Sequence, residues 1–429
     1  MIKPSLVLIP TAYRAGKVYS VLPADGVGDF NFSRATTATR INKDGLIETV
    51  GSNVPRLNYP MIDGVVSGCP SLLLEPARTN LVTYSEDFSQ SYWTKSGASV
   101  ASGFTSPERL SNAYKLVEDT ATSIHYIVSG QIDIANATPY SMSCIVKANG
   151  RNWVKMTSWS GHSLFYDLAN VATGTATGGA TGTIKPLADG FYRLTMSYTS
   201  AATVEKIFIF LGDADNSIDY TGDGTSGIYI YGAQLELGSY PTSYIPTNGS
   251  AATRIVDYSL GQLTTGFFND NEGTLFLYFK AFENDTSYRY IAISDGTVSN
   301  RVVITIDNTF RIQCAVSLSG VTQSNVIKQM TNNSLSSGFK VAMTYKNNEF
   351  KSFVNGVETT PRDTSGSVFP TGTLKYLRFT QGNATSGPLN GETSAVQYYN
   401  TVLIDTDLEE LTSWRSFSEM ARELLYTIE

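Results

Sequence analysis

Residues 192–198 have the sequence Tyr-Arg-Leu-Thr-Met-Ser-Tyr, in which a large, mainly apolar side chain occupies every second position. Residues 124–128 (IHYIV), 140–146 (YSMSCIV) and 227–231 (GIYIY) follow a similar period of two. In a β-strand, successive side chains point to opposite faces, so this period predicts strands with one face in a core. Sheets that bury one face in this way are typically antiparallel. The chain is therefore expected to be mainly β.

The composition agrees with this expectation and excludes several functions. Only 16% of the 429 residues are charged, against about 25% in a typical soluble protein. Glycine (36) and tyrosine (25) are abundant, which suits turns and strands. The net charge of -7, with no basic run, argues against nucleic acid as a partner. The longest apolar runs are far shorter than the ~20 residues of a membrane helix, so no membrane insertion is expected.

Cysteine and histidine are too sparse to predict a disulfide framework or a zinc site. Cys69, Cys144 and Cys314 are scattered, and His125 and His162 are the two histidines. Three unpaired, widely spaced cysteines fit synthesis in a reducing cytoplasm. The N-terminus also lacks the apolar region of an export signal, so secretion is not expected.

Four segments are predicted along the chain. Residues 1–80 are rich in proline, which favours an extended β and loop segment lying along another surface. Residues 81–257 predict an antiparallel sandwich of jelly-roll type, within which the low-complexity stretch 173–183 forms an exposed loop or irregular edge. Residues 258–405 predict a second β domain, and residues 406–429 a short C-terminal α-helix.

The C-terminal segment changes from a period of two to steps of three and four residues. Thr406 and Glu409 have the spacing of a capping box, which would start a helix there. Two interpretations of the apolar stripe stay open: a helix packed on its own sandwich, or an oligomerisation helix. The stripe consists of Leu408, Leu411, Trp414, Phe417, Ala421, Leu424 and Leu425.

Two segments of the second β domain resemble a known fold. Residues 338–345 (GFKVAMTY), followed by residues 353–356 (FVNG), resemble the hairpin of concanavalin A-like (laminin G-like) lectin domains. The resemblance covers about a third of the chain and implies a concanavalin A-like sandwich over residues 258–405.

A second resemblance concerns the segments on either side of the jelly roll. Residues 73–81 (LLEPARTNL) and 229–254, which begin YIYGAQLELG, resemble segments of bacteriophage virion proteins, particularly tail-fibre and head-appendage subunits. In those proteins a carbohydrate-binding-module-like jelly roll lies between the two motifs. The resemblance implies a virion location, other virion proteins as partners, a homo-oligomer with a trimer favoured, and contact with host cell-surface glycan.

Tryptophan supplies the candidate sugar-binding residues. A sugar site needs flat aromatic faces for the apolar carbons and polar neighbours for the hydroxyls. Trp159 lies in the stretch Thr-Ser-Trp-Ser-Gly-His (157–162), whose small residues predict an accessible loop. We therefore select Trp159, His162 and Trp153 as carbohydrate-binding candidates, against the alternative that they pack in a core or subunit interface.

Four acidic residues form the only candidate metal site. Asp213, Asp215, Asp219 and Asp223 could offer oxygen ligands to a structural Ca²⁺. Ile218 stands where an EF-hand loop requires glycine, so a solvated turn is the competing interpretation. No other cofactor is predicted.

No motif of enzyme chemistry is present in the sequence. The Glu-x-Asp-x-x-Glu strand pattern of concanavalin-like hydrolases, a Gly-x-Ser-x-Gly elbow and a His-Glu-x-x-His motif are all absent. We therefore expect a non-enzymatic virion subunit that contributes to glycan binding. The alternatives are a purely architectural virion subunit and, third, a glycan depolymerase with carboxylates brought together across subunits.

Overall fold

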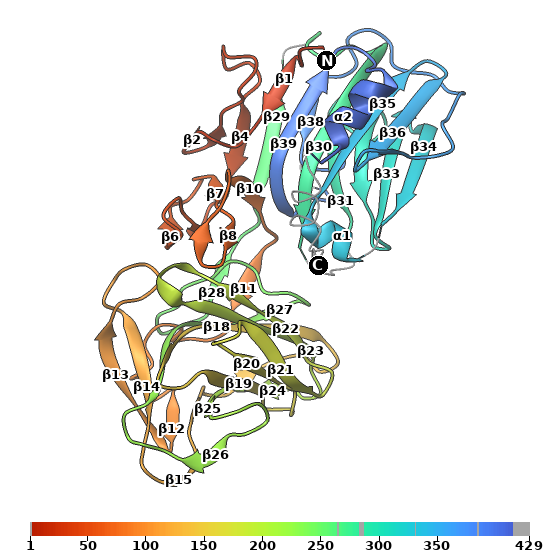
Figure 1. The fold of residues 1–429 in the computed structure, drawn as a ribbon. Coiled ribbons are helices and arrows are strands. Elements are labelled where there is room, and N and C mark those ends of the chain that lie inside the picture. The colour runs from red at the N-terminus through yellow and green to blue at the C-terminus, as the bar shows by residue number, and fades with distance from the viewer. Residues whose placement is uncertain (1, 264–265, 283–286, 331, 384–385, 415–429) are drawn as a thin grey trace.

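The computed structural model describes residues 2–263, 266–282, 287–330, 332–383 and 386–414, and it consists of two β-sandwiches joined by a narrow connection (Figure 1). Two α-helices occur in these residues, α1 (Asn332–Ser337) and α2 (Asp405–Thr412). The prediction of a mainly β chain with two sandwiches is confirmed. Within these ranges no helix is long and apolar enough to span a membrane.

The first lobe, here called the middle sandwich, is built from two six-stranded antiparallel sheets. Sheet 3 runs in the order β12 (Thr94–Ser96), β16 (Tyr126–Val128), β25 (Ile207–Gly212), β19 (Trp153–Ser158), β20 (Ser163–Asp167) and β21 (Ala172–Thr177). Sheet 4 runs in the order β13 (Ala98–Phe104), β14 (Ala113–Glu118), β27 (Gly227–Leu237), β18 (Pro139–Asn149), β23 (Tyr192–Thr199) and β22 (Thr181–Pro186).

The core of this lobe follows the period of two seen in the sequence. Leu194 and Met196 of β23 are fully buried, together with Met142 and Cys144 of β18. The low-complexity stretch 173–183 forms most of β21 and the start of β22, which are edge strands of the two sheets. It is therefore an edge with a short turn, one of the two outcomes expected of it.

The second lobe, here called the C-terminal sandwich, also has two sheets. Sheet 1 contains β37 (Val357–Glu358), β36 (Glu349–Val354), β35 (Phe339–Lys346), β30 (Glu272–Ala281), β39 (Gly391–Tyr399), β10 (Ser71–Leu74) and β7 (Arg56–Asn58), with β1 (Leu6–Leu8) also paired to β39. Sheet 2 contains β2 (Tyr13–Arg14), β3 (Lys17–Val18), β4 (Phe30–Ser33), β29 (Tyr258–Gln262), β38 (Tyr376–Arg378), β31 (Arg289–Ser294), β32 (Arg301–Ile306), β33 (Arg311–Leu318) and β34 (Val321–Gln329).

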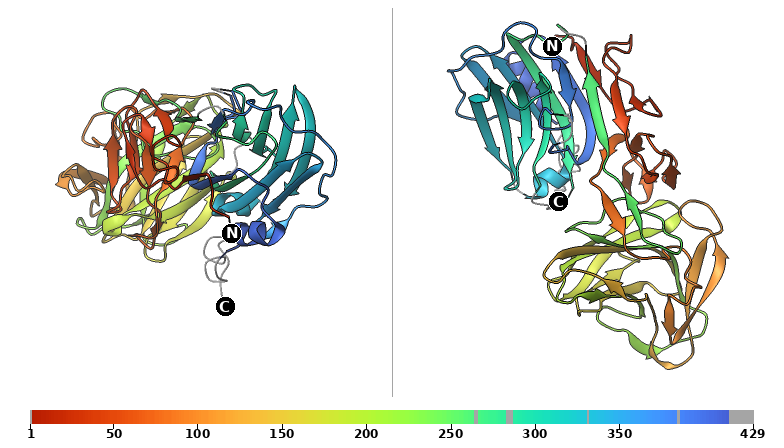
Figure 2. Two further views of the ribbon diagram at one scale, coloured as in Figure 1. Left: turned by 90° about the horizontal axis from the view of Figure 1, so that it is seen from above. Right: turned by 180° about the vertical axis from the view of Figure 1, so that it is seen from behind.

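Strands of residues 1–80 thus belong to both sheets of the C-terminal sandwich, and they run beside β39 and β29 in Figures 1 and 2. Leu6 pairs with Tyr398, and Leu72 pairs with Thr393 on the same strand. Leu6, Leu72 and Phe30 are fully buried in the core of this lobe. These strands therefore fill part of that lobe's interior.

Short two-stranded ribbons complete the structure. They are β11 (Arg78–Asn80) with β28 (Ala252–Arg254), β5 (Ala38–Ile41) with β6 (Ile47–Val50), β8 (Met61–Ile62) with β9 (Val65–Val66), β15 (Thr122–Ile124) with β26 (Asp219–Thr221), and β17 (Ile132–Asp133) with β24 (Val204–Glu205). The ribbon of β11 and β28 carries the chain into and out of the middle sandwich (Figure 1). Ile47 of β6 packs against Tyr231 and Tyr244 of that sandwich.

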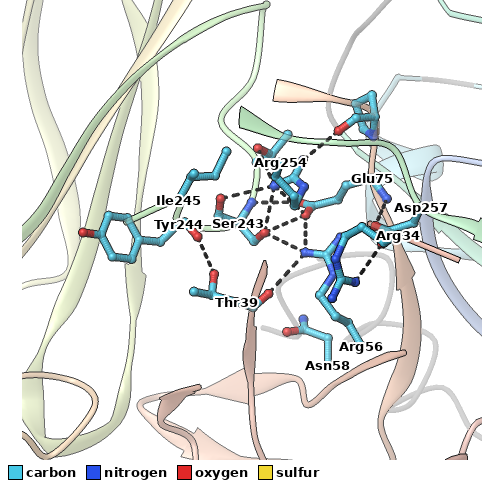
Figure 3. A network of polar contacts seen from close by, with 12 residues as sticks. Arg34, Thr39, Arg56, Asn58, Glu75, Ser243, Tyr244, Ile245, Arg254 and Asp257 are labelled. Carbon is cyan, nitrogen blue, oxygen red and sulfur yellow. Dashed lines mark hydrogen bonds and ion pairs between the residues drawn. The ribbon is translucent and has the colours of Figure 1, made fainter. Parts of the chain in front are cut away.

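A buried ionic network lies at the junction of the two lobes (Figure 3). Arg56 of β7 forms ion pairs with both Glu75 and Asp257. Arg254 of β28 reaches Glu75 at 3.1 Å, and Arg34 reaches Asp257 at 3.0 Å. All five side chains are buried. Because an unpaired buried charge is costly, each member of this network requires the others.

The network also includes the middle sandwich. The backbone N–H and the hydroxyl of Ser243, which follows β27, donate hydrogen bonds of 2.7 and 2.6 Å to Glu75. Glu75, Ser243 and Arg254 all belong to the two motifs that resemble phage virion proteins. These motifs therefore build the joint between the lobes.

The helix α2 packs against sheet 1 of the C-terminal sandwich. Leu408 is fully buried against Phe276 and Phe353, and Leu411 packs at the edge of the same cluster. The Nζ atom of Lys340 lies 4.4 Å from the centroid of the Trp414 ring. The structure thus packs Leu408, Leu411 and Trp414 on the C-terminal sandwich, and an oligomer contact through the same helix stays a prediction.

The predicted capping box is wrong. The helix begins at Asp405, so its N-cap is Ile404 and Thr406 falls inside the first turn, and no side chain caps the helix. Asp405 instead accepts a hydrogen bond of 2.7 Å from Lys351 of β36. Phe417, Ala421, Leu424 and Leu425 lie outside the described residues.

Candidate functional site

The outward face of sheet 3 carries a row of aromatic rings. In β25, Ile207, Ile209 and Leu211 point into the core, so Phe208 and Phe210 point outward. The Phe208 and Phe210 rings stack with centroids 5.8 Å apart and planes 9° apart. This alternation places two parallel rings on the outward face of the sheet, where Phe208 is half-buried and Phe210 is buried.

Two further rings extend the row at its ends. Trp159, in the turn after β19, stacks on Phe208 with centroids 6.2 Å apart and an interplanar angle of 12°. Tyr126 of β16 lies 4.9 Å from Phe210, its cross-strand partner. We call Trp159, Phe208, Phe210 and Tyr126 the aromatic row. Trp159 is 53% exposed, so one end of the row is open to solvent.

Two lysines border the aromatic row. The Nζ atom of Lys206 lies 4.8 Å from the Trp159 ring centroid, and that of Lys155 lies 5.7 Å from the Phe210 centroid. Burial lowers the pKa of Lys155. The two ammonium groups supply hydrogen-bond donors next to aromatic faces, a combination that suits a ligand with apolar carbons and polar oxygens.

Glu205 fixes the turn that presents Trp159. Its carboxylate accepts hydrogen bonds from the Trp159 backbone N–H and, at 2.7 Å, from the Tyr198 hydroxyl. Burial raises the pKa of Glu205. The Ser158 hydroxyl accepts a further bond of 3.1 Å from the His162 backbone N–H across the same turn. Glu205 is fully buried, so it positions Trp159 and does not itself reach a ligand.

The structure places the three sugar-binding candidates, Trp159, His162 and Trp153, in different surroundings. Trp159 joins the aromatic row, but His162 stacks on Tyr198 at 4.9 Å, and its Nδ1 lies 2.6 Å from the Gly178 carbonyl oxygen. Trp153 lies at the other end of β19, opposite Gly212 of β25. The structure therefore brings one of these three residues to the aromatic row.

Sequence analysis missed Phe208, Phe210 and Tyr126. The local sequence of residues 207–211 (IFIFL) indicates only an apolar run. The signal lies in the large apolar side chains that occupy both faces of this strand, directly after the charged Lys206. Pairing of Tyr126 with Phe210 depends on the strand register, which the local sequence does not reveal.

The four acidic candidates do not gather around one point. Asp215 accepts hydrogen bonds of 2.8 and 2.9 Å from the N–H and hydroxyl of Thr175. Asp223 accepts hydrogen bonds from Ser226, which lower the pKa of its carboxyl group. Asp213 and Asp219 are exposed. In the described part of the chain no three His, Cys, Asp or Glu side chains are grouped as metal ligands.

The chain was also compared with known proteins. No protein-family model matches it, and no curated protein matches it. Among solved structures, a Ruminococcus gnavus IT-sialidase CBM40 bound to α2,3-sialyllactose is 19% identical, with a TM-score of 0.29, over 34% of this chain and 83% of that chain.

Two other solved structures align over more of the chain. The mouse laminin α1 chain domains LG4-5 are 10% identical, with a TM-score of 0.27, over 65% of this chain and 86% of that chain. A putative carbohydrate binding protein from Bacteroides ovatus is 13% identical, with a TM-score of 0.28, over 68% of this chain and 80% of that chain. Scores this low establish no shared family, so the function must be inferred from the side chains of this chain.

Proposed function

We propose that this chain is a glycan-binding protein that holds sugars against the aromatic row of the middle sandwich without cleaving them. The observation that carries the proposal is the open end of the row, where the exposed Trp159 ring lies nearly parallel to Phe208. Sugar rings expose C–H groups on their faces, and these pack on aromatic faces. Lys206 and the Ser160 hydroxyl stand beside Trp159 as partners for sugar hydroxyls.

The placement of Glu205 supports binding without hydrolysis. Glycoside hydrolysis needs two carboxyl groups that reach opposite sides of the glycosidic bond. The carboxylate that supports the Trp159 turn, Glu205, is fully buried and already accepts bonds from Trp159 and Tyr198. It has no access to a sugar bound on the row.

Replacing Trp159 by alanine is expected to weaken glycan binding about tenfold, which corresponds to about 1.4 kcal/mol. The change removes the exposed stacking face and leaves the buried core of sheet 3 intact. A glycan array first identifies the glycan that binds best. Calorimetric titration with that glycan then measures the affinity of each variant. The matched control is Leu110→Ala, because Leu110 is a 56% exposed apolar residue outside the aromatic row. Equal affinity of Trp159→Ala and the unchanged chain would contradict the proposal.

The finer proposal concerns where the protein works. We infer that the chain is a subunit of a bacteriophage appendage, a tail or head fibre, and that it acts as a homo-oligomer, with a trimer favoured. The resemblance of residues 73–81 and 229–254 to virion proteins supports this inference. Weak sugar contacts on several copies then combine, because all copies are carried by one particle.

Antibody labelling of phage particles in the electron microscope tests the virion location, and the expected result is label on an appendage. Sedimentation of the purified protein at high concentration tests the oligomer, and a monomer would contradict it. Normal particle assembly with no binding on the glycan array would instead support a purely architectural subunit.

A further inference from the structure

The outward face of sheet 2, on the C-terminal sandwich, carries two arginines on neighbouring strands. Ser294 of β31 pairs with Tyr376 of β38 on one side and with Arg301 of β32 on the other. Residues directly opposite each other in antiparallel strands share a face. Arg378, two residues after Tyr376, shares that face as well. Ile293, Val302 and Leu377 alternate with these residues and fill the core.

Both guanidinium groups meet backbone carbonyls instead of carboxylates. Arg301 donates a 2.6 Å hydrogen bond to the carbonyl of Gln381, and Arg378 donates one of 3.2 Å to the carbonyl of Gly382. The two cations therefore converge on consecutive residues of one loop. The Nε atom of Arg301 is buried and has no hydrogen-bond partner.

Neither arginine forms an ion pair with a carboxylate of the described residues. Asp295, which directly follows β31, instead accepts hydrogen bonds of 2.8 Å from both Asn300 and Thr297. Burial lowers the pKa of both guanidinium groups. A partly desolvated cation without a counter-ion is unfavourable, and an anion that binds there relieves this cost.

Other arginines of the same chain form ion pairs with nearby carboxylates. Arg311 of β33, also on sheet 2, reaches Asp307 at 2.7 Å. Arg151 in the middle sandwich reaches Glu118 at 2.6 Å. Unlike Arg311 and Arg151, Arg301 and Arg378 have no acid partner among the described residues, and their own strands provide none.

Tyrosine rings flank the two arginines. The Arg378 guanidinium carbon lies 4.1 Å from the centroid of the Tyr376 ring. Tyr290, on the same face of β31, stacks on Tyr288 with centroids 6.1 Å apart, and Tyr288 is 44% exposed. Flat rings next to planar guanidinium groups offer one surface for C–H groups and another for a carboxylate.

We propose that this face, with Arg301 and Arg378 between Tyr376 and Tyr290, is a second glycan site that selects sugars bearing a carboxylate. Two guanidinium forks match the planar geometry of a carboxylate, and the exposed Tyr288 ring, stacked beside Tyr290, receives the sugar carbons. The site is on the other lobe from the aromatic row and differs from it in chemistry. The proposal of this second site can therefore be correct even if the aromatic row binds no glycan.

The test uses the full chain and oligosaccharides that end in a uronic acid or a nonulosonic acid, each compared with its own methyl ester. We expect at least one acid to bind, and its methyl ester to bind at least tenfold more weakly, because esterification removes the charge that the arginines recognise. Raising the NaCl concentration from 0.05 to 0.5 M should weaken binding of the acid as well.

Arg301→Met and Arg378→Met are each expected to lower affinity for the acid at least fivefold, and Arg378→Lys should retain part of it. Arg311→Met is the matched control and should leave binding unchanged, as should Trp159→Ala, which affects only the first site. Thermal unfolding of each variant confirms that it is folded. Equal binding of acid and ester, no binding of any acid, or an equal loss in Arg311→Met would overturn the proposal.

Discussion

Replacing Glu75 by glutamine is expected to destabilise the protein by about 3–5 kcal/mol, the range seen when one partner of a buried ion pair is removed. Glu75 is the shared acceptor of Arg56 and Arg254, and all three side chains are buried. The neutral amide keeps the volume but leaves Arg254 without its ion-pair partner and Arg56 with Asp257 alone. Because the network joins the lobes, we expect the two sandwiches to lose their fixed connection first.

Urea unfolding followed by tryptophan fluorescence measures this loss. The control is Glu48→Gln, because Glu48 pairs with Arg40 while its side chain is 40% exposed. Exposed pairs contribute about 0–1 kcal/mol, so this variant should unfold almost like the unchanged chain. A loss below 1 kcal/mol for Glu75→Gln would show that the network is not needed for stability.

The same carboxyl group predicts a dependence on pH. Arg254, Arg56 and hydrogen bonds from Ser243 outweigh the effect of burial and lower the pKa of Glu75 from 4.5 to about 2. A depressed pKa in the folded state stabilises the fold above the unfolded pKa and loses that effect as the group is protonated. The contribution is thus complete above about pH 4.5 and declines toward pH 2. Unfolding midpoints of Glu75→Gln should lack this part of the acid response.

Much of the fold could be predicted from local sequence, because alternation along one strand is a local property. Residues 192–198 and 140–146 form strands β23 and β18, and the apolar side chains at alternate positions reach the core, but both faces of β18 are buried. The pairing of Leu6 with Tyr398 could not be predicted, because these residues lie near opposite ends of the described chain. The sharing of residues 1–80 between two sheets follows from such long-range pairs.

The candidate site likewise combines residues that the local sequence indicates with residues that only the fold brings together. Trp159 could be selected from its own neighbours, since serine and glycine around a tryptophan favour an accessible turn. Phe208 and Tyr126 become part of a site only when β25 lies between β16 and β19, and that order comes from packing of the whole sandwich. Arg301 and Arg378 carry no local signal either, because what marks them is a missing acid in three dimensions.

Replacing Trp159 and Phe208 together by alanine is expected to weaken glycan binding about a hundredfold, or about 2.7 kcal/mol. Phe208 stacks with Trp159 on one side and with Phe210 on the other, so its loss removes the support that holds the exposed Trp159 ring in the aromatic row. The effects of substitutions at residues in contact are not additive. Because Phe208 also supports Trp159, Phe208→Ala alone should weaken glycan binding more than Trp159→Ala alone.

The fold should survive this change, because both rings point outward while Ile207 and Ile209 fill the core. Calorimetric titration of the two single variants, the double variant and Leu110→Ala with one glycan completes a double-mutant cycle. A coupling energy near zero would mean that the two rings act independently and do not form a continuous surface. A double variant that binds as tightly as Leu110→Ala would place the glycan elsewhere on the molecule, because both stacking faces at the open end of the aromatic row would then be dispensable.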